Sequence, residues 1–284
     1  MINIVMLNWN SLEDIYNNFE VISGFKDKEN IRLIIVNNDC VDIDIVAFSN
    51  SQLELHVVNN GCNLGYTGGN NAGYKYIVDN SLNGDVLIIN PDVKIDESIV
   101  NALASALNID GVAAAMPIAV DENNITLYRN IKLSGFIEHR SKEETSELYL
   151  DTDYVAGSCF ALKRVALDKT FLFDNDYFLY WEEVDLSLRL RKLGFKLLAV
   201  QNAKVERRSN EIVRQINSQY YLVRNSFLIR SKNTILFSIP SHFIYLNKRL
   251  LIAIYLSIKV SNIRPLANFM TGLIDGMRGK YEKR

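Results

Sequence analysis

The sequence has few of the residues that build disulfide frameworks or zinc sites. Its 284 residues include three cysteines, three histidines and four prolines. The cysteines are Cys40, Cys62 and Cys159, which are odd in number, widely spaced and without a Cys-x-x-Cys pair. A disulfide scaffold and a metal knuckle are therefore disfavoured, and a reducing, cytoplasmic compartment is expected.

Charge of one sign and long apolar runs are also lacking. The 31 basic and 33 acidic residues give a formal net charge of -2, so the composition does not indicate a surface that binds nucleic acid. No stretch reaches the roughly 18 uninterrupted apolar residues that span a bilayer. Residues 1–7 lack the basic start and long apolar centre of a signal peptide, so we expect them to form a first β-strand.

The N-terminal part of the chain alternates short apolar runs with helical patterns. Strands are predicted at residues 2–7, 31–36, 53–58, 86–89 and 112–116, and helices at residues 12–22, 71–79 and 97–107. The strand runs are rich in Ile, Val and Leu with little alternation, as in parallel strands covered on both faces. This order predicts an α/β fold with a doubly wound, mostly parallel central sheet and helices on both faces.

The middle of the chain has a weaker pattern. Residues 117–150 are polar and are expected to form an irregular loop or insertion, with a solvated charge run at residues 141–144. A helix is expected from residue 183 to residue 193, because Leu186, Leu190 and Leu193 recur at helical spacing. Gly194 follows where a glycine commonly ends a helix.

The C-terminal residues, 226–284, interleave apolar residues with Lys and Arg, as at residues 247–252 and 277–284. Basic amphipathic helices of this kind can lie on an anionic membrane surface, which here would be the inner face of the membrane. The same pattern fits a helical extension that packs on the core or on a second subunit in a homodimer. Both alternatives stay open on the sequence.

Polar residues follow each predicted strand of the N-terminal part. They are Asn8-Trp9-Asn10, Asn37-Asn38-Asp39, Asn59-Asn60-Gly61 and Asn90-Pro91-Asp92. Ligands of doubly wound sheets bind beyond the carboxyl ends of the strands, so these residues are expected to converge on one cleft.

The turn Asn90-Pro91-Asp92 has a feature of its own. An apolar strand delivers the Asp92 carboxylate to its end, and Pro91 fixes the backbone angle there. A carboxylate in this position can hold a hard divalent cation that binds two phosphate oxygens. A plain break between strand and turn is the alternative.

Residues 63–73 are rich in glycine. Glycines let the backbone approach a ligand closely, and the start of the following helix favours anions. The spacing matches neither a dinucleotide-binding fingerprint nor a Walker loop. An ordinary glycine-rich turn before a helix is the alternative.

Three carboxylates, Glu182, Glu183 and Asp185, cluster at a predicted helix start. The helix dipole stabilises negative charge at this end. An ionised carboxylate can accept the proton of a hydroxyl nucleophile. Acidic capping of the helix is the alternative.

Taken together, in this order and spacing, these motifs resemble the family-2 glycosyltransferases with the GT-A fold, in particular the rhamnosyltransferase-like branch. The resemblance covers residues 1–230 and is carried by residues 5–11, 34–39, 63–73, 89–92, 156–160 and 182–191. It implies a GT-A domain at residues 1–225, with a nucleotide-binding half at 1–116 and an acceptor and catalytic half at 117–225. It also implies transfer of rhamnose or another hexose from a nucleoside-diphosphate sugar to a hydroxyl of a glycan or lipid-linked glycan in cell-surface polysaccharide synthesis.

The resemblance also implies roles for individual residues. Those that would contact the nucleotide sugar are Asn8, Asn10, Asn37, Asn38, Asn63, Gly65, Asn70, Asn90, Asp92, Gly157, Ser158 and Arg224. Asp92 matches the second acidic residue of a metal-binding Asp-x-Asp, with Asn90 replacing the first, and would hold Mg²⁺ or Mn²⁺. Glu183 matches the catalytic base of an inverting displacement, and Asp185 would orient the acceptor or cap the helix.

Two positions depart from the family pattern. Asn37 replaces an Asp that commonly ends the second strand, which puts the usual contact with the base in doubt. Glu206-Arg207-Arg208 stands where a metal-binding His is common. Glu206 would then supply an oxygen ligand, or Arg207 would neutralise part of the phosphate charge, or metal binding would be weak.

Three other functions remain open on the sequence. The departures fit a catalytically inactive homologue that binds glycans or partners. A sugar nucleotidyltransferase shares a related core, although the start Asn8-Trp9-Asn10-Ser11 lacks the basic phosphate loop of that class. The third is a structural interaction protein, which binding of a nucleoside diphosphate would exclude.

Overall fold

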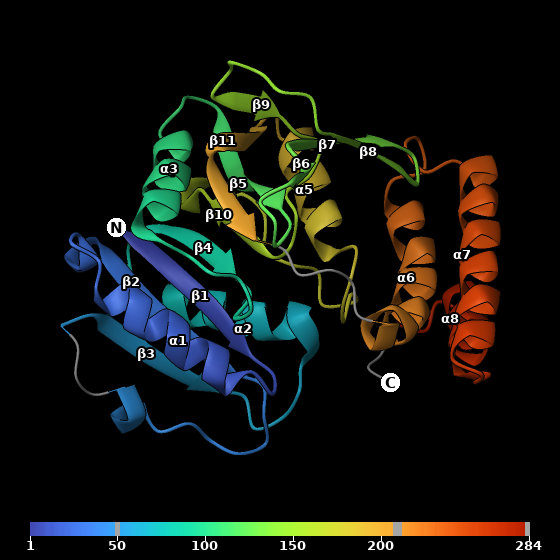
Figure 1. Cartoon of the computed structure of the whole chain (residues 1–284), viewed down its shortest axis with the longest axis horizontal. Coiled ribbons are helices and arrows are strands. Elements are labelled where there is room, and N and C mark those ends of the chain that lie inside the picture. Colours follow the sequence, from blue (N-terminus) through green and yellow to red (C-terminus); the bar gives the residue numbers. More distant parts are fainter. Residues whose placement is uncertain (49–51, 207–211, 282–284) are drawn as a thin grey trace.

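The computed structural model describes residues 1–48, 52–206 and 212–281. Within these residues, nine strands form one sheet in the order β3-β2-β1-β4-β10-β5-β11-β9, with β6 paired to β5 (Figure 1). The strands of this sheet are β1 (Ile2–Asn8), β2 (Ile31–Asn37), β3 (Glu54–Asn59), β4 (Asp85–Ile89), β5 (Val112–Val120), β6 (Thr126–Tyr128), β9 (Tyr149–Asp151), β10 (Cys159–Leu162) and β11 (Lys196–Glu206).

Helices flank the sheet and extend beyond it (Figure 1). They are α1 (Leu12–Ser23), α2 (Gly65–Asp79), α3 (Glu97–Leu107), α4 (Arg164–Leu167), α5 (Glu182–Lys192), α6 (Ile212–Lys232), α7 (Ile239–Lys259) and α8 (Arg264–Met277), with short 3₁₀ turns at η1 (Lys28–Asn30) and η2 (Ile45–Phe48). Gly194, with φ 84°, follows the end of α5 as expected from the sequence.

The central sheet is mostly parallel, as the sequence predicts. β3, β2, β1 and β4 run parallel to one another, and β5 runs parallel to β11. β10 lies antiparallel between β4 and β5 and joins the two parallel parts. The prediction of an α/β fold with a mostly parallel central sheet is therefore confirmed.

Alternate residues of the buried strands point to two separate hydrophobic cores. On β1, Val5 packs in one core with residues of α2 and α5, whereas Ile4 and Met6 pack in the other with residues of α1 and α3. All seven residues of β2 are buried. This burial on both faces explains why the strand sequences are almost continuously apolar.

The glycine-rich stretch differs from its prediction, because α2 begins at Gly65 and not at residue 71. Glycine disfavours helix, but here it allows the helix to lie very close to the sheet. A methyl group on Gly69 would lie 2.8 Å from Nδ2 of Asn38, and one on Gly73 would lie 2.7 Å from Cγ2 of Val36. These two glycines therefore serve helix packing, and the predicted loop was wrong for residues 65–70.

The prediction of an irregular segment at residues 117–150 was also wrong. β5 continues to Val120, β6 pairs back onto it, and β9 adds the outer strand of the sheet. Between them β7 (Asn130–Ser134) and β8 (Ile137–Ser141) form an antiparallel hairpin. The polar composition arises because these strands lie near the surface, where one side faces water. Of the charge run at residues 141–144, which was predicted to be a solvated loop, residues 142–144 do lie in a loop, at residues 142–148 between β8 and β9.

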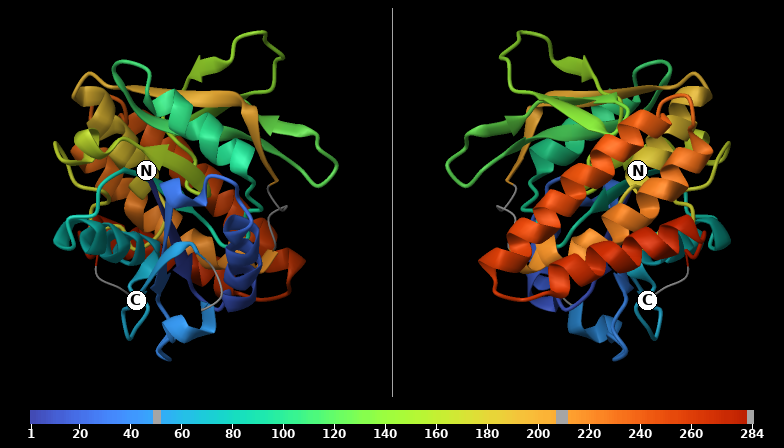
Figure 2. Two further views of the ribbon diagram at one scale, coloured as in Figure 1. Left: turned by 90° about the vertical axis from the view of Figure 1, so that its left-hand side faces the viewer. Right: turned by 90° about the vertical axis from the view of Figure 1, so that its right-hand side faces the viewer.

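The last three helices form a layer beside the sheet (Figures 1 and 2). α8 packs closely on α6, since a methyl group on Gly272 would lie 2.6 Å from the carbonyl oxygen of Tyr220. α6 runs unbroken through residue 225, so the division of the chain at that point stays a prediction. No helix among the described residues is long and apolar enough to cross a membrane.

Candidate active site

Asparagine side chains at the ends of β1, β2 and β3 form a hydrogen-bonded row. The parallel register pairs Asn8 with Asn37 and Asn37 with Asn59. The side-chain amide of Asn8 donates to Oδ1 of Asn37 at 2.9 Å, and that of Asn37 donates to Oδ1 of Asn59 at 2.9 Å. Three of the four strand ends that were predicted to converge thus meet in this row. Asn8 and Asn37 are buried, so their side chains support this edge of the sheet without being exposed at its surface.

Asp39 is a polar residue of this edge that was not among the predicted site residues. Its Oδ2 accepts a hydrogen bond from Nδ2 of Asn8 at 2.7 Å, and both of its oxygens lie 3.4 Å from the backbone nitrogen of Asn10. Asn10 is exposed and has a left-handed φ of 52°. A carboxylate is thus present at the end of β2, two residues after the position where Asn37 replaces the usual Asp. Its place in Asn37-Asn38-Asp39 was the available signal.

The start of α2 connects this edge with the loop before α5. Asn38 donates to the carbonyl oxygen of Gly65 at 2.9 Å, and Oδ1 of Asn63 accepts from the Gly65 nitrogen at 2.7 Å. Gly65 has φ 75°, and a methyl group on it would overlap the carbonyl oxygen of Phe178. The backbone nitrogen of Thr67 also donates to that oxygen, at 3.4 Å.

Two buried polar atoms on the first turns of α2 have no hydrogen-bond partner among the described residues. They are Oγ1 of Thr67 and Oδ1 of Asn70, although the Asn70 amide donates to the carbonyl oxygen of Tyr66 at 2.8 Å. Both residues are 1% exposed. Buried polar atoms are normally paired, so these two mark this end of α2 as a place with unused hydrogen-bonding capacity.

The turn Asn90-Pro91-Asp92 is held beside the start of β10. The backbone nitrogen of Asn90 donates to the carbonyl oxygen of Ser158 at 2.8 Å. The preceding carbonyl, of Gly157, accepts a hydrogen bond from the Tyr66 hydroxyl. Burial raises the pKa of Tyr66 well above its ordinary value, and the nearby Glu182 and Glu183 add to the effect, so this hydroxyl keeps its proton. Three motifs far apart in sequence therefore meet here.

Glu183 lies against Gly157. A methyl group on Gly157 would lie 3.2 Å from Oε1 of Glu183, so the absence of a side chain leaves room for the carboxylate. The neighbouring Glu182 is 3% exposed. Burial, the charge of Glu183 and a hydrogen bond to it raise the pKa of Glu182 well above the ordinary value. Burial and the neighbouring Glu183 therefore favour the protonated form of Glu182.

A strained turn presents this pair at the start of α5. Tyr180 and Trp181 have φ of 68° and 77°, which is uncommon for bulky residues. The side-chain amide of Asn225 donates to the carbonyl oxygens of Leu179 and Tyr180, both at 2.9 Å. The Trp181 ring nitrogen donates to the carbonyl oxygen of Leu222 at 3.2 Å. α6 therefore fixes the turn that orients Glu182 and Glu183.

Arg224 and Asp185 are both buried and bonded within the protein. Arg224 is 0% exposed, lies over the ring of Tyr221 and donates to the carbonyl oxygen of Asp176. Oδ2 of Asp185 accepts from Nε of Arg189 at 2.8 Å, and that arginine also binds the carbonyl oxygens of Phe171 and Leu172. The observed contacts of both residues hold the loops before α5 in place. Contact of Arg224 with a diphosphate, or of Asp185 with an acceptor, stays a prediction.

The carboxylates that would hold a metal are Asp92 and Glu206. Asp92 is exposed and has neither a hydrogen bond nor an ion pair in the described part of the chain. Glu206, at the end of β11, lies 3.5 Å from Nζ of the exposed Lys94, two residues after Asp92. Among the described residues no three His, Cys, Asp or Glu side chains gather. One or two carboxylates still fit Mg²⁺ or Mn²⁺ that takes further ligands from phosphates and water. Arg207 and Arg208 lie outside the described residues.

Comparison with known proteins was made at the level of families, sequences and structures. No family model matches the chain. Over 311 aligned positions the chain is 24% identical to the low-salt glycan biosynthesis hexosyltransferase Agl10 of Haloferax volcanii, and the match covers 99% of this chain and 92% of that protein.

Two solved glycosyltransferase structures have a similar fold at 12% sequence identity. The mannosyltransferase PcManGT from Pyrobaculum calidifontis, in complex with GDP-Man and Mn²⁺, has a TM-score of 0.60 over 98% of this chain and 87% of that one. GalNAc-T7 with UDP, GalNAc and Mn²⁺ has a TM-score of 0.57 over 80% of this chain, which spans half of that protein. The GT-A-type fold and the full-length similarity to a hexosyltransferase together support a glycosyltransferase enzyme.

Proposed function

We propose that this chain is an inverting hexosyltransferase that uses a nucleoside-diphosphate sugar as donor. The observation that carries the proposal is the position of Glu183, which lies against Gly157 beside the turn that carries Asp92. The carboxylate of Glu183 at a helix start thus contacts the segment that is hydrogen-bonded to the turn carrying the exposed Asp92. Glu183 suits a general base, and Asp92 suits a diphosphate-bound cation.

In the proposed reaction, the hydroxyl oxygen of the acceptor attacks the anomeric carbon from the face opposite the diphosphate. The new bond between oxygen and carbon forms as the bond from carbon to the diphosphate oxygen breaks. Glu183 takes the hydroxyl proton. Glu182, whose protonated form is favoured by burial and by the neighbouring Glu183, would donate a hydrogen bond to Glu183 and hold it in place. Asp185 is a positioning residue, because its carboxylate secures Arg189 and the loop beneath α5.

Asp92 and Glu206 are the residues that would hold Mg²⁺ or Mn²⁺, and the bound cation would neutralise charge on the leaving diphosphate. Asn10, Asn38, Asp39 and the start of α2 would bind the base and the ribose. Gly157 and Ser158 would line the space for the transferred sugar and the acceptor. Unused hydrogen-bonding capacity at Thr67 and Asn70 supports a polar ligand at this end of α2.

For the substrates, we propose the rhamnosyltransferase-like branch of family 2. The donor would carry rhamnose or another hexose, and the acceptor would be a glycan or lipid-linked glycan of a cell-surface polysaccharide. The motif order, from Asn8-Trp9-Asn10 to the Glu182-Glu183 pair, supports the branch. The full-length similarity to a hexosyltransferase of glycan biosynthesis supports the hexose and the glycan.

The test is transfer by the Glu183→Gln variant, with Glu143→Gln on the exposed charged loop as the matched control. Loss of the base should reduce transfer by about 10² to 10⁴, while donor affinity measured by calorimetry stays near the wild-type value. A panel of nucleotide sugars with and without Mn²⁺ would first identify the donor. Retained transfer in Glu183→Gln would overturn the assignment of the base. A wild-type chain that binds donors but neither transfers nor hydrolyses them would be the inactive homologue.

A further inference from the structure

α7 is a long helix that buries little of its apolar surface. Of its 21 residues, all of them described, only His242, Ala253 and Leu256 are buried. Phe243, Leu251 and Ile258 are 69%, 67% and 74% exposed. They recur every seven or eight residues and so share one face of the helix, away from α6 and α8. A helix of a globular protein normally turns such a face inward.

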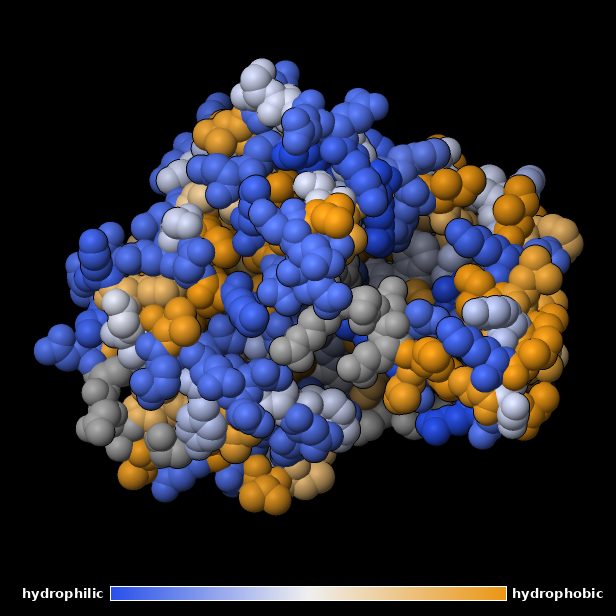
Figure 3. Space-filling view, viewed as in Figure 1, coloured by the Kyte–Doolittle hydropathy of each residue, from blue (hydrophilic) through white to orange (hydrophobic). Residues whose placement is uncertain are grey.

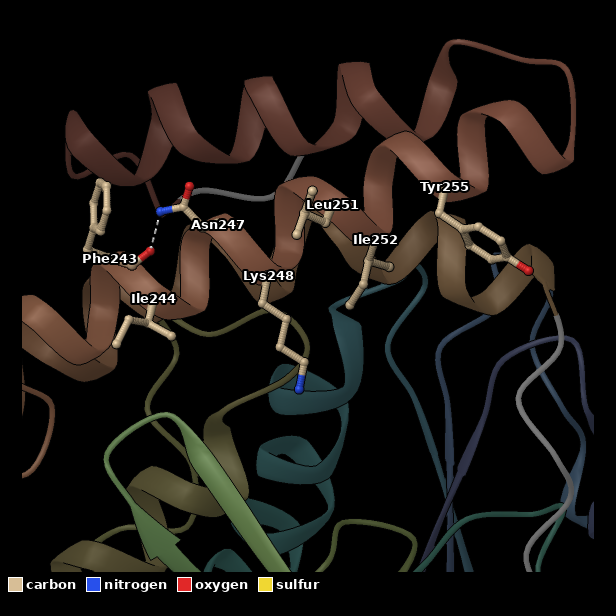
Figure 4. A pocket seen from close by; sticks show the side chains of 7 residues that line it. All are labelled: Phe243, Ile244, Asn247, Lys248, Leu251, Ile252 and Tyr255. Carbon is tan, nitrogen blue, oxygen red and sulfur yellow. Dashed lines mark hydrogen bonds between the residues drawn. The ribbon is translucent and has the colours of Figure 1, made fainter.

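This outer face forms an open apolar groove. Its volume is about 630 Å³, and it is lined by Phe243, Ile244, Asn247, Lys248, Leu251, Ile252 and Tyr255 (Figure 4). The space-filling view shows apolar residues gathered over the C-terminal helices, at the end of the molecule away from the sheet (Figure 3). Contiguous exposed apolar surface of this kind marks contact with another protein or with a membrane.

The charge of the same region has a single sign. α7 carries Lys248, Arg249 and Lys259 and contains no acidic residue. Over residues 233–281 there are three more basic residues and one acidic residue, Asp275, which accepts a hydrogen bond from the Tyr220 hydroxyl. The chain as a whole has a net charge of -2, so this excess of positive charge is local to the C-terminal helices.

The charge pattern distinguishes between two occupants of the groove. In a twofold contact between two copies, the same face of α7 would meet itself, so Lys248 and Lys259 would face a helix that carries basic residues and no carboxylate. An anionic lipid surface instead accepts the apolar side chains among its acyl chains and the lysines at its head groups. We propose that α7 docks this protein on an anionic phospholipid bilayer, lying in the plane of the interface. This proposal does not depend on the transfer reaction.

The test is sedimentation of the full-length chain with vesicles of phosphatidylcholine alone or mixed with phosphatidylglycerol. The wild-type chain should sediment with the anionic vesicles, and added salt should weaken the binding. Lys248→Glu with Lys259→Glu should reduce the affinity on the order of tenfold or more. Phe243→Ser with Leu251→Ser should do the same at any salt concentration, because it removes buried apolar area. Ile125→Ser, which removes an exposed Ile from the turn between β5 and β6, is the control and should bind as the wild type.

Three results would overturn the proposal. The first is a wild-type chain that stays in the supernatant with anionic vesicles. The second is that the wild type binds both kinds of vesicle with the same affinity, and that Lys248→Glu with Lys259→Glu leaves this affinity unchanged. The third is a wild-type dimer in light scattering that Phe243→Ser with Leu251→Ser converts to a monomer, without any vesicle binding. Circular dichroism and thermal melting establish that each variant is folded, so loss of binding reports on the surface alone.

Discussion

The side-chain nitrogen of Asn225 lies 2.9 Å from the carbonyl oxygen of Tyr180, a residue held in a left-handed backbone conformation. This bond joins α6 to the turn that starts α5. Because the strain at Tyr180 and Trp181 persists only when surrounding contacts enforce it, Asn225 is one of the residues that keep Glu183 in place.

Asn225→Ala should therefore lower activity through position. Removing a buried donor to two carbonyl oxygens is expected to cost about 1–3 kcal/mol of unfolding free energy. Turnover should fall more than donor affinity, because the change shifts Glu183, the proposed base, and leaves the strand ends proposed to bind the nucleotide in place. Steady-state kinetics and chemical denaturation would measure both. Asn101→Ala, at an exposed site on α3, is the matched control. If Asn225→Ala kept the wild-type turnover, the conformation of Tyr180 and Trp181 would not depend on the Asn225 side chain.

Gly65 and Gly61 provide a second comparison. Both have positive φ, 75° and 66°, so alanine at either site costs roughly 1 kcal/mol of backbone strain. A methyl group on Gly65 would also lie 2.6 Å from Cδ2 of Phe178, whereas nothing lies within 4 Å of one on Gly61. Gly65→Ala should thus be more destabilising than Gly61→Ala by about 1–3 kcal/mol in urea denaturation. Equal losses of unfolding free energy in the two variants would mean that the loop at Phe178 moves to accommodate the methyl group without a measurable cost.

Glu182 should make stability depend on pH. Its pKa in the fold is raised well above 4.5 by burial and by Glu183, so the folded chain holds this proton to higher pH than the unfolded chain does. The stability from the protonated form is fully present below about pH 4.5 and is lost as the pH rises through the folded pKa. Glu182→Gln cannot ionise. Its unfolding free energy relative to wild type should rise by about 1.4 kcal/mol per pH unit across that window. Urea titrations at a series of pH values would measure this, and a relative stability that falls with pH would contradict the assignment.

Asp92→Ala tests the metal site. Without this carboxylate, the affinity for a nucleoside diphosphate in the presence of Mn²⁺ should fall about tenfold or more, toward the value that the wild type shows with a chelator. Calorimetry with and without Mn²⁺ would measure the difference. Asp110→Ala, at an exposed turn after the C-terminal end of α3, should leave both affinities unchanged. Unaltered dependence on Mn²⁺ in Asp92→Ala would place the cation on other residues.

Features set by local pattern were predictable from the sequence. The ends of β1, β2 and β3 could be expected to meet, because parallel strands end at the same edge, and Asn8 and Asn37 do pair there. The acidic start of α5 was likewise visible in the run Glu182-Glu183.

Features set by tertiary contact were not predictable. Glycine propensity indicates a loop at residues 65–70, and only the contact of Gly69 with Leu7 and Asn38 explains a helix there. The polar composition of residues 117–150 conceals strands that pair at the surface. The bond from Asn225 to Tyr180 joins residues 45 apart, so no local pattern announces it.

The antiparallel direction of β10 has a consequence for how this edge of the sheet is built. At this edge, the residues beside the parallel strands come after those strands in the chain. Gly157 and Ser158 instead come before β10, because β10 runs in the opposite direction. The segment that leads into Gly157 is itself part of the hydrophobic core, because Tyr154, Val155 and Ala156 are buried. In the proposed reaction, the nucleotide is therefore bound by residues that follow strands, and the transferred sugar by residues that precede one, so the two sets of contacts lie on separate pieces of chain.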